Sequence, residues 1–233
     1  MRICIIPARG GSKRIPRKNI KEFRGKPVIA YSILAAIDSG LFDKIMVSTE
    51  DKQIAKIATQ FGAEVPFFRS TVNSNDYSGT GDVMFEVISE YARENIFFDQ
   101  ACCIYATAPL IRKERLKEAF DLFLNGNFDV VFPAGRYGSS IFRSYQADSN
   151  GMVFMNFPEY EISRTQDLPE AYFDAGQFYW FYPEKLINLE NKNIFGNIKG
   201  AVLLDEHEVQ DIDQPWDWEI AELKYSYIQS KYV

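Results

Sequence analysis

Short apolar runs alternate with helix-like segments along the first 132 residues, and this alternation constrains the fold more than any other feature of the sequence. Strands are expected at 3–6, 44–49, 64–68, 100–105 and 128–132. Apolar residues with helical spacing fill the intervals, at 28–37, 51–61, 82–95 and 112–125. Strands separated by helices of this length form parallel sheets that are covered on both faces. We therefore predict an α/β protein with three layers around a mostly parallel sheet.

The pattern changes near residue 136. Residues 137–145 and 152–157 are expected to form short strands, and Asn150-Gly151 is typical of a hairpin turn. Ala171–Phe181 is aromatic and strand-like. Exposed aromatic hairpins often pack against a second subunit. We predict one domain over residues 1–233, with an inserted arm at about 136–182. The alternation then resumes with strands at 200–204 and 211–213 and a final helix at 215–232.

Composition narrows the classes of function. The net charge of −6 does not suggest a general nucleic-acid-binding surface. No apolar run is long enough for a secretory signal or a membrane span, so no membrane partner is expected. The three cysteines lie in strand-like runs, which indicates reduced thiols in a cytoplasmic protein. The single histidine, His207, argues against a Ser-His-Asp triad and a histidine-rich zinc site.

A glycine-rich basic loop follows the first predicted strand. Gly10 and Gly11 allow a tight turn, and the ten residues from Arg9 to Lys18 carry five cations: Arg9, Lys13, Arg14, Arg17 and Lys18. Backbone N–H groups can cradle phosphate oxygens, and arginine and lysine can neutralise a triphosphate. Ligands of open α/β sheets bind beyond the carboxyl ends of the strands, where this loop lies. The alternative is a solvated basic loop, which is less expected in an acidic chain. The spacing matches neither a Walker A motif nor GxGxxG.

A pair of carboxylates, Asp211 and Asp213, flanks Ile212 near the end of the chain. In a strand these two side chains point to the same face. Hard oxygen donors beside a triphosphate suit Mg²⁺, which binds through one or two carboxylates and the substrate phosphates. Exposed strand ends often carry such pairs, but a basic phosphate loop in the same chain favours a magnesium site.

Two further segments are weaker candidates. Ser163–Pro169 and Ala171–Tyr179 offer a cation, amides and aromatic rings to a carboxylated, polyhydroxylated ligand, although a turn and an edge strand explain them equally well. Arg69 with Asn73–Gly81 offers polar groups to the edge of a base. Taken alone, that second segment is better explained as a surface loop.

Three of these motifs together resemble a known family. Ala8–Asn19 resembles the signature of the CMP-sialic acid synthetase family of cytidylyltransferases. Val47–Asp51 is similar to the second-strand motif of that family, and Asp211–Asp213 to its metal motif. Ser163–Trp180 is most similar to the pseudaminic acid cytidylyltransferases. The chain departs from sialic acid synthetases at Tyr105–Ile111 and at Ala175-Gly176, where the family binds its sugar.

The resemblance implies a Rossmann-like nucleotidyltransferase fold and a role for each matching residue. The implied catalytic residues are Arg9, Lys13, Lys18, Asp211 and Asp213, of which the two aspartates hold Mg²⁺. The implied nucleotide-binding residues are Ala8, Arg9, Gly10, Gly11, Ser12, Lys18, Asn19, Arg69 and Thr80. The implied sugar-binding residues are Tyr105, Arg164, Gln166 and Tyr179. A homodimer is also implied, with the arm crossing to the partner subunit.

The implied reaction joins CTP to pseudaminic acid, a nine-carbon sugar acid, and releases CMP-pseudaminic acid and pyrophosphate. The anomeric hydroxyl would attack the α-phosphate in line with help from Mg²⁺, and the protein would mainly supply positioning and charge neutralisation. N-acetylneuraminate, legionaminate and Kdo are alternative acceptors. A glycosyltransferase with an Asp-x-Asp metal pair and a non-catalytic nucleotide-binding protein are more distant alternatives.

Overall fold

The main sheet of the computed structural model has the strand order β11-β6-β10-β5-β1-β4. The model describes residues 1–188, 194 and 196–232. The strands are β1 Arg2–Pro7, β4 Lys44–Ser48, β5 Gln100–Ile104, β6 Val130–Arg136, β10 Phe178–Phe181 and β11 Lys199–Leu204. The pairs β1–β4, β1–β5 and β6–β11 are parallel, and β10 is antiparallel to both β5 and β6. The prediction of a mostly parallel sheet is confirmed.

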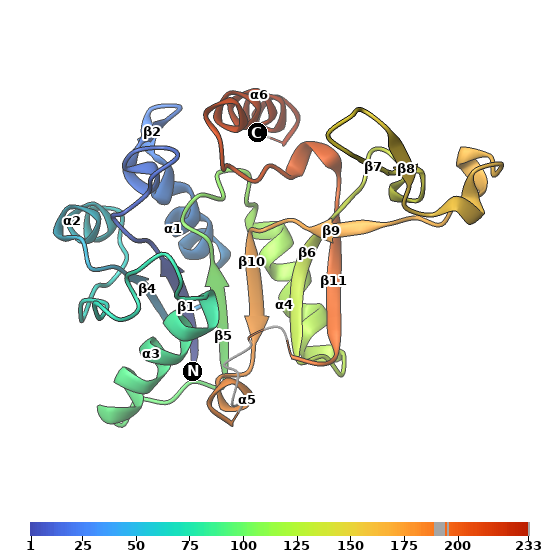
Figure 1. Cartoon of the computed structure of the whole chain (residues 1–233). Helices are drawn as coiled ribbons and strands as arrows, with labels where there is room; N and C mark the ends of the chain where they lie inside the picture. Colours follow the sequence, from blue (N-terminus) through green and yellow to red (C-terminus); the bar gives the residue numbers. More distant parts are fainter. Residues whose placement is uncertain (189–193, 195, 233) are drawn as a thin grey trace.

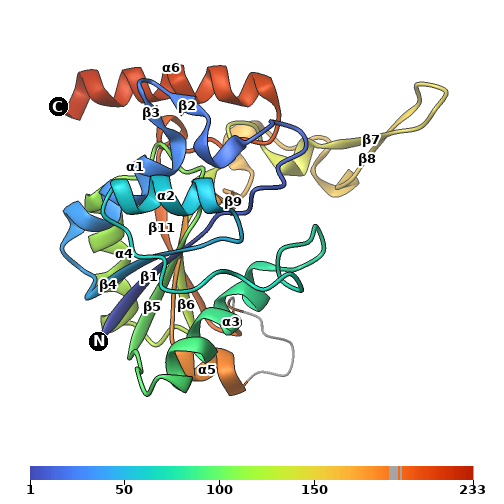
Figure 2. The same ribbon diagram turned by 90° about the vertical axis from the view of Figure 1, so that its left-hand side faces the viewer.

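Helices cover both faces of this sheet (Figures 1 and 2). One face packs against α1 (Val28–Ser39), α2 (Lys52–Gln60) and α4 (Lys113–Asn125). The other packs against α3 (Thr80–Arg93) and α5 (Pro183–Asn188). Successive side chains of β1 enter opposite layers, because strand residues alternate between the two faces. The three-layer architecture is therefore confirmed.

The last helix, α6 (Pro215–Tyr232), lies across one end of the sheet (Figure 1). Its Trp218 packs with Phe23 of a small hairpin formed by β2 (Glu22–Phe23) and β3 (Lys26–Pro27). Ile212 is fully buried in the same cluster. This satellite core fixes the segment before α6 next to the loop after β1. In the described part of the chain, no helix is long and apolar enough to cross a membrane.

Three expected strands differ from the structure. Residues 64–68 contribute only one bridge, Met46 to Glu64, because Pro66 has no N–H for a ladder. The aromatic run 171–181 is two strands, β9 (Tyr172–Asp174) and β10, separated by a turn in which Gly176 has φ +62°. Residues 137–145 are not a strand, since Ser140 caps a 3₁₀ turn at Ile141–Arg143.

The segment between β6 and β10 leaves the sheet and projects from the body (Figures 1 and 2). It carries the antiparallel hairpin of β7 (Tyr145–Ala147) and β8 (Val153–Met155), with the turn at Asn150-Gly151 as predicted. Two 3₁₀ turns follow, at Pro158–Tyr160 and Thr165–Asp167. Exposed apolar side chains gather on this arm: Tyr145, Met152, Val153, Phe154 and Ile162.

One face of the sheet is left open beside the arm. On the side of α3, the strands β6 and β11 line a hollow with Phe132, Ala134, Ala201 and Leu203, and Leu203 is 52% exposed. The opposite side of the same strands is buried under α4, with Val131 and Val202 in the core. The molecule therefore presents an apolar arm and an open apolar sheet face.

Candidate active site

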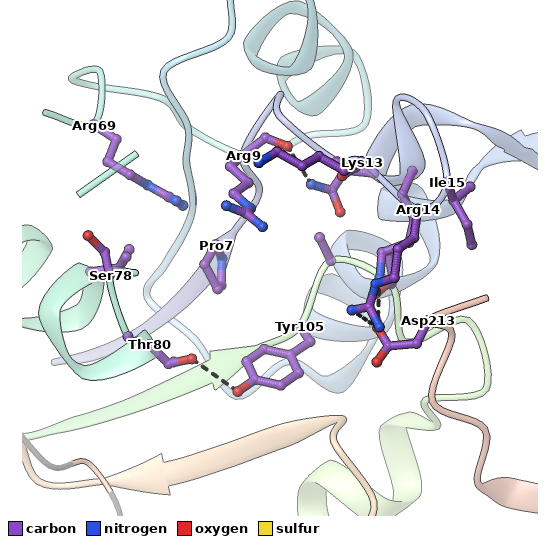
Figure 3. A pocket seen from close by; sticks show the side chains of 17 residues that line it. Pro7, Arg9, Lys13, Arg14, Ile15, Arg69, Ser78, Thr80, Tyr105 and Asp213 are labelled. Carbon is purple, nitrogen blue, oxygen red and sulfur yellow. Dashed lines mark hydrogen bonds and ion pairs between the residues drawn. The ribbon is translucent and has the colours of Figure 1, made fainter. Parts of the chain in front are cut away.

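A cavity of about 250 Å³ opens at the carboxyl ends of β1 and β5, where an open α/β sheet binds its ligands (Figure 3). Its wall is formed by the loop after β1, the start of α3, the residues after β5 and the segment before α6. The predicted site residues that line it are Arg9, Ser12, Lys13, Lys18, Asn19, Arg69, Thr80, Tyr105 and Asp213. The fold thus gathers residues that are up to about two hundred positions apart in the chain.

The loop after β1 has a fixed shape. Ala8 is buried and donates its N–H to Ser48 O at 2.9 Å, and Asn19 Nδ2 donates to Arg9 O at 2.8 Å. A Cβ on Gly10 would lie 2.6 Å from Asp51 Oδ2, so a larger residue there would have to displace the Asp51 side chain. The Gly10 N–H itself donates to Glu50 Oε1 at 2.7 Å. Ala8, Gly10 and Gly11 are not among the cavity-lining residues, and the hydrogen bonds of Ala8 and Gly10 shape the loop.

Two cations of the loop share one carboxylate from a distant segment. Arg9 Nη1 and Lys13 Nζ each lie 2.5 Å from a carboxylate oxygen of Asp76, and Arg9 also donates to Asn75 O at 3.2 Å. The hydrogen bonds from Lys13 and Arg9 hold the pKa of Asp76 below its usual value. An anionic group therefore already occupies the position that these cations offer to a phosphate.

Two other cations hold the segment of the aspartate pair. Arg14 Nη2 lies 2.8 Å from Asp213 Oδ1. Lys18 Nζ donates to Ile212 O at 2.6 Å and lies 3.7 Å from Asp213 Oδ1. Burial lowers the pKa of Lys18, an effect that Asp213 partly offsets. The fifth cation, Arg17, does not line the cavity and bonds to Asp51, the N-cap residue of α2, and to Gln53 in that helix.

Asp211 and Asp213 lie in an extended segment that is not a strand, contrary to the prediction. The alternation of side chains nevertheless survives, because Ile212 is anchored in the core while both aspartates face outward. Asp213 lines the main cavity, and both carboxylates line a neighbouring one. Burial, followed by the charge of Asp213, raises the pKa of Asp211. Two hard oxygen donors on one side of a short segment are a donor set that suits Mg²⁺.

The opposite wall of the cavity is formed by Arg69, Thr80 and Tyr105, with Tyr179 behind them. Arg69 is buried and donates from Nε to Ser48 Oγ at 3.0 Å, and it still lines the cavity (Figure 3). Thr80 Oγ1 and Tyr105 OH lie 3.0 Å apart. Tyr179 is 2% exposed and lies behind Tyr105, with their ring centroids 5.4 Å apart. Tyr179 therefore supports the wall without lining the cavity.

Arg164 and Gln166 are not brought to this cavity within one chain. Both lie on the arm, at the 3₁₀ turn Thr165–Asp167 and the residue before it. The Arg164 side chain is 73% exposed and donates from Nε to Asp167 Oδ2 at 2.7 Å. Neither residue lines the cavity, so their contact with the sugar stays a prediction.

Sequence analysis did not single out three carboxylates that support the site. Asp76 holds Arg9 and Lys13, but only folding brings it to them. Asp217 accepts the N–H groups of Asp213 at 2.9 Å and Gln214 at 2.7 Å, and an acidic residue in the first turn of a predicted helix could have revealed this cap. Glu208 is buried against Arg112 and Arg115, shortly before the aspartate pair.

Comparisons with known proteins identify relatives of the whole chain. The sequence profile of the cytidylyltransferase family matches residues 3–204. The pseudaminic acid cytidylyltransferase of Campylobacter jejuni is 41% identical, over 96% of this chain and 95% of its own length. The CMP-N,N'-diacetyllegionaminic acid synthase of Legionella pneumophila is 33% identical, over 94% of each chain.

A solved structure supports the fold independently. A CMP:2-keto-3-deoxy-manno-octonic acid synthetase in complex with CTP superposes with a TM-score of 0.68 at 17% identity, over 98% of this chain and 99% of the other. At that identity the likeness concerns the fold alone. The profile match and the relatives together show that the chain belongs to the cytidylyltransferase family.

Proposed function

We propose that this chain transfers CMP from CTP to pseudaminic acid and releases pyrophosphate. The observation that carries the proposal is the cavity at the ends of β1 and β5, where Arg9, Lys13 and Lys18 face Asp213. The similarity to pseudaminic acid cytidylyltransferase, together with the resemblance of Ser163–Trp180 to that group of enzymes, supports pseudaminic acid as the acceptor.

In this proposal the protein binds and orients the two substrates. Arg9, Lys13 and Lys18 bind the triphosphate and neutralise the charge that develops on the leaving pyrophosphate. The buried Arg69 and the start of α3 at Thr80 hold the cytidine end. The anomeric hydroxyl of the sugar acid then attacks the α-phosphorus opposite the pyrophosphate, and its proton leaves as the new P–O bond forms and the bond to pyrophosphate breaks.

Asp211 and Asp213 are proposed to hold Mg²⁺. Their carboxylates lie on one side of the Ile212 backbone, which Lys18 and Asp217 fix by hydrogen bonds. When bound, the ion supplies positive charge at the α-phosphate. The contact between Asp213 and Arg14 places a further positive group beside the same carboxylate. The chain itself thus contributes the ligands and their orientation.

A pyrophosphate-release panel tests the function. The protein is mixed with each of the four nucleoside triphosphates and with pseudaminic acid, legionaminic acid, N-acetylneuraminic acid or 2-keto-3-deoxy-manno-octonic acid, with and without Mg²⁺. We expect release with CTP and pseudaminic acid in the presence of Mg²⁺. Preference for another acid would mean that this acid, not pseudaminic acid, is the acceptor. Release of a nucleoside phosphate instead of pyrophosphate would indicate a glycosyltransferase. CTP binding without turnover would indicate a non-catalytic protein.

We also propose a homodimer in which each arm covers the open sheet face of its partner. The apolar residues of the arm, including Met152 and Phe154, and the hollow at Phe132 and Leu203 support this pairing. Arg164 and Gln166 would then reach the partner's cavity instead of their own. The three buried free thiols support a reducing, cytoplasmic location for the dimer.

Co-expression of two inactive variants tests the crossing of the arm. Arg9→Ala damages the cavity of the body, and Arg164→Ala damages the arm. In a mixed dimer with crossed arms, one site combines an intact body with an intact arm, so activity returns. If each arm served its own chain, every site of the mixture would keep one defect and activity would stay absent. Sedimentation of the separate variants confirms that both still form dimers.

A further inference from the structure

The fifth cation of the basic loop, Arg17, and the dipeptide Glu50-Asp51 between β4 and α2 are not among the residues that line the cavity. Arg17 and Asp51 instead contact each other. Two guanidinium nitrogens of Arg17 face the carboxylate: Nη1 is hydrogen-bonded to Oδ2, and Nη2 donates to Oδ1 at 3.2 Å. Nη2 also donates to Gln53 Oε1 at 2.8 Å. This ion pair joins the end of the loop after β1 to the start of α2.

The Asp51 carboxylate is held in place by backbone groups. Its Oδ1 accepts the N–H groups of Gln53 at 2.8 Å and of Ile54 at 3.0 Å, so it caps α2. Its own N–H donates at 3.1 Å to Oγ1 of Thr49, which is fully buried. The position of the carboxylate is therefore set by α2 and by the residue after β4, and Arg17 binds to it there.

The backbone of Arg17 is in the left-handed region, with φ 55° and ψ 32°. This conformation is unfavourable for a residue with a Cβ, and it persists only where the surrounding contacts enforce it. Two residues of the cavity wall follow directly. Lys18 Nζ donates to Ile212 O at 2.6 Å, beside the aspartate pair. Asn19 Nδ2 donates to Arg9 O at 2.8 Å. The turn at Arg17 therefore sets the direction in which both side chains leave the loop.

The dipeptide Glu50-Asp51 also holds the beginning of the loop. Gly10 donates its N–H to Glu50 Oε1 at 2.7 Å. A Cβ on Gly10 would lie 2.6 Å from Asp51 Oδ2, the oxygen to which Arg17 Nη1 is bonded. Both ends of the loop thus meet at the start of α2, and the residues between them include Lys13, which lines the cavity.

We propose that Arg17 and Asp51 are positioning residues for the triphosphate, because their ion pair holds Arg17 in the left-handed conformation and so keeps Lys18 and Asn19 directed at the nucleotide. This inference rests on the proposed binding of CTP by the loop. In this role the charge of Arg17 is neutralised by Asp51 and does not serve the phosphates. If Arg17 were instead a cation that attracts the triphosphate, removal of the Asp51 charge would have the opposite effect on CTP binding.

Calorimetry of CTP binding to Asp51→Asn, in the presence of Mg²⁺, separates these two roles by the sign of the change. Asparagine caps a helix as well as aspartate does, so α2 stays capped, but Arg17 loses its ionised partner. We expect CTP to bind about 10-fold more weakly, as for the loss of a hydrogen bond between charged groups. Gln53→Ala is the matched control, since it removes the neutral partner of the same guanidinium, and it should change the affinity less than about twofold. Unchanged or tighter CTP binding by Asp51→Asn would overturn the proposal.

Substitutions of Arg17 test the backbone argument. Arg17→Ala removes the ion pair and keeps a Cβ, so the turn leaves the left-handed region and CTP should again bind about 10-fold more weakly. Arg17→Gly also removes the ion pair, but glycine adopts a positive φ without a steric penalty, so it should bind CTP about threefold more tightly than Arg17→Ala does. A double variant of Arg17→Ala and Asp51→Asn should lose nothing more, because both changes break one pair. Equal affinities of the alanine and glycine variants would show that Arg17 acts through its charge alone.

Hydrogen exchange of the protein without nucleotide keeps this test independent of the proposed function. The N–H groups of Lys18 and Ile20 are hydrogen-bonded within the loop, to Ile15 O and Arg17 O. A peptide covering residues 9–20 should therefore exchange faster in Asp51→Asn than in the wild type, while a peptide covering α2 keeps its protection because the cap remains. If the wild type bound no CTP, the proposed function would fail, and the exchange would still test the ion pair. Equal exchange of the loop peptide in both proteins would show that the pair does not hold the loop.

Discussion

Glu208 anchors the segment that precedes the aspartate pair, and its charge can be removed with little change in shape. The carboxylate is 1% exposed. It accepts from Arg112 Nη1 at 2.9 Å and from Arg115 Nε and Nη2 at 3.1 and 2.7 Å. Its own carbonyl accepts from Gln177 Nε2 at 2.6 Å, which ties the segment to the turn before β10. Glu208→Gln would therefore leave two guanidinium groups facing an amide.

The expected cost follows from this burial. Removing one partner of a buried ion pair typically costs 3–5 kcal/mol, because the remaining charge is left without compensation. Arg112 and Arg115 are partly exposed and keep contacts with Glu114 and Glu118, so we expect the lower end, about 3 kcal/mol. With an unfolding slope of about 2 kcal/mol per molar urea, the midpoint should fall by roughly 1.5 M.

Urea unfolding, followed by tryptophan fluorescence and circular dichroism, measures this effect. Glu118→Gln is the matched control, since Glu118 is 51% exposed and bonds to the same Arg115. Exposed pairs contribute about 0 to 1 kcal/mol, so the control midpoint should hardly move. If Glu208→Gln lowered the free energy of unfolding by less than about 1 kcal/mol, or if both variants lowered it equally, burial would not make Glu208 an anchor.

Three other predictions concern the carboxylates around the loop. The hydrogen bond from Arg17 lowers the pKa of Asp51 from 3.8 to about 2. The ionised Asp51 therefore adds about 2 kcal/mol to the free energy of unfolding above pH 4, and this contribution is lost between about pH 4 and 2. Urea unfolding of the wild type and of Asp51→Asn across this pH range measures it. Asp76→Asn should tighten CTP binding about fivefold in calorimetry, because the Asp76 carboxylate no longer competes with the triphosphate for Arg9 and Lys13. Weaker binding would contradict this competition. Asp217→Ala should cost about 1–2 kcal/mol and raise the Mg²⁺ concentration needed for half-maximal activity, because the cap on the Asp213 N–H is lost.

The layers of the fold could be predicted from periodicity, because burial repeats with the period of the element. The alternation of Ile3, Cys4, Ile5 and Ile6 between two cores requires only a strand covered on both faces. Periodicity does not reveal which strands are neighbours. Phe178–Phe181 is buried throughout and lies between β5 and β6, antiparallel to both, although about forty residues separate it from β6.

Only the parts of the site whose residues are close together in the sequence could be predicted. The loop after β1 could be recognised because its glycines and cations are consecutive. The partners of those cations could not, because Asp76 lies 67 residues from Arg9 and Asp213 lies 199 residues from Arg14. The location of Arg164 on an arm likewise depends on where the chain leaves the sheet, which no local pattern of charge or hydrophobicity records.

These distant partners imply that nucleotide and metal should bind together. Arg14 and Lys18 line the cavity and both contact Asp213, so a triphosphate that binds these two cations without a metal would take them away from that carboxylate. A triphosphate that arrives with a divalent ion offers phosphate oxygens to Arg14 and Lys18 and a cation to Asp213 and Asp211, so every charge keeps a partner. We therefore expect Mg²⁺ to tighten CTP binding in calorimetry by about tenfold or more, a linkage of at least about 1.4 kcal/mol. Asp213→Asn should reduce this gain most, because it removes the shared carboxylate. Equal affinities with and without Mg²⁺ in the wild type would show that the loop binds the triphosphate without this exchange.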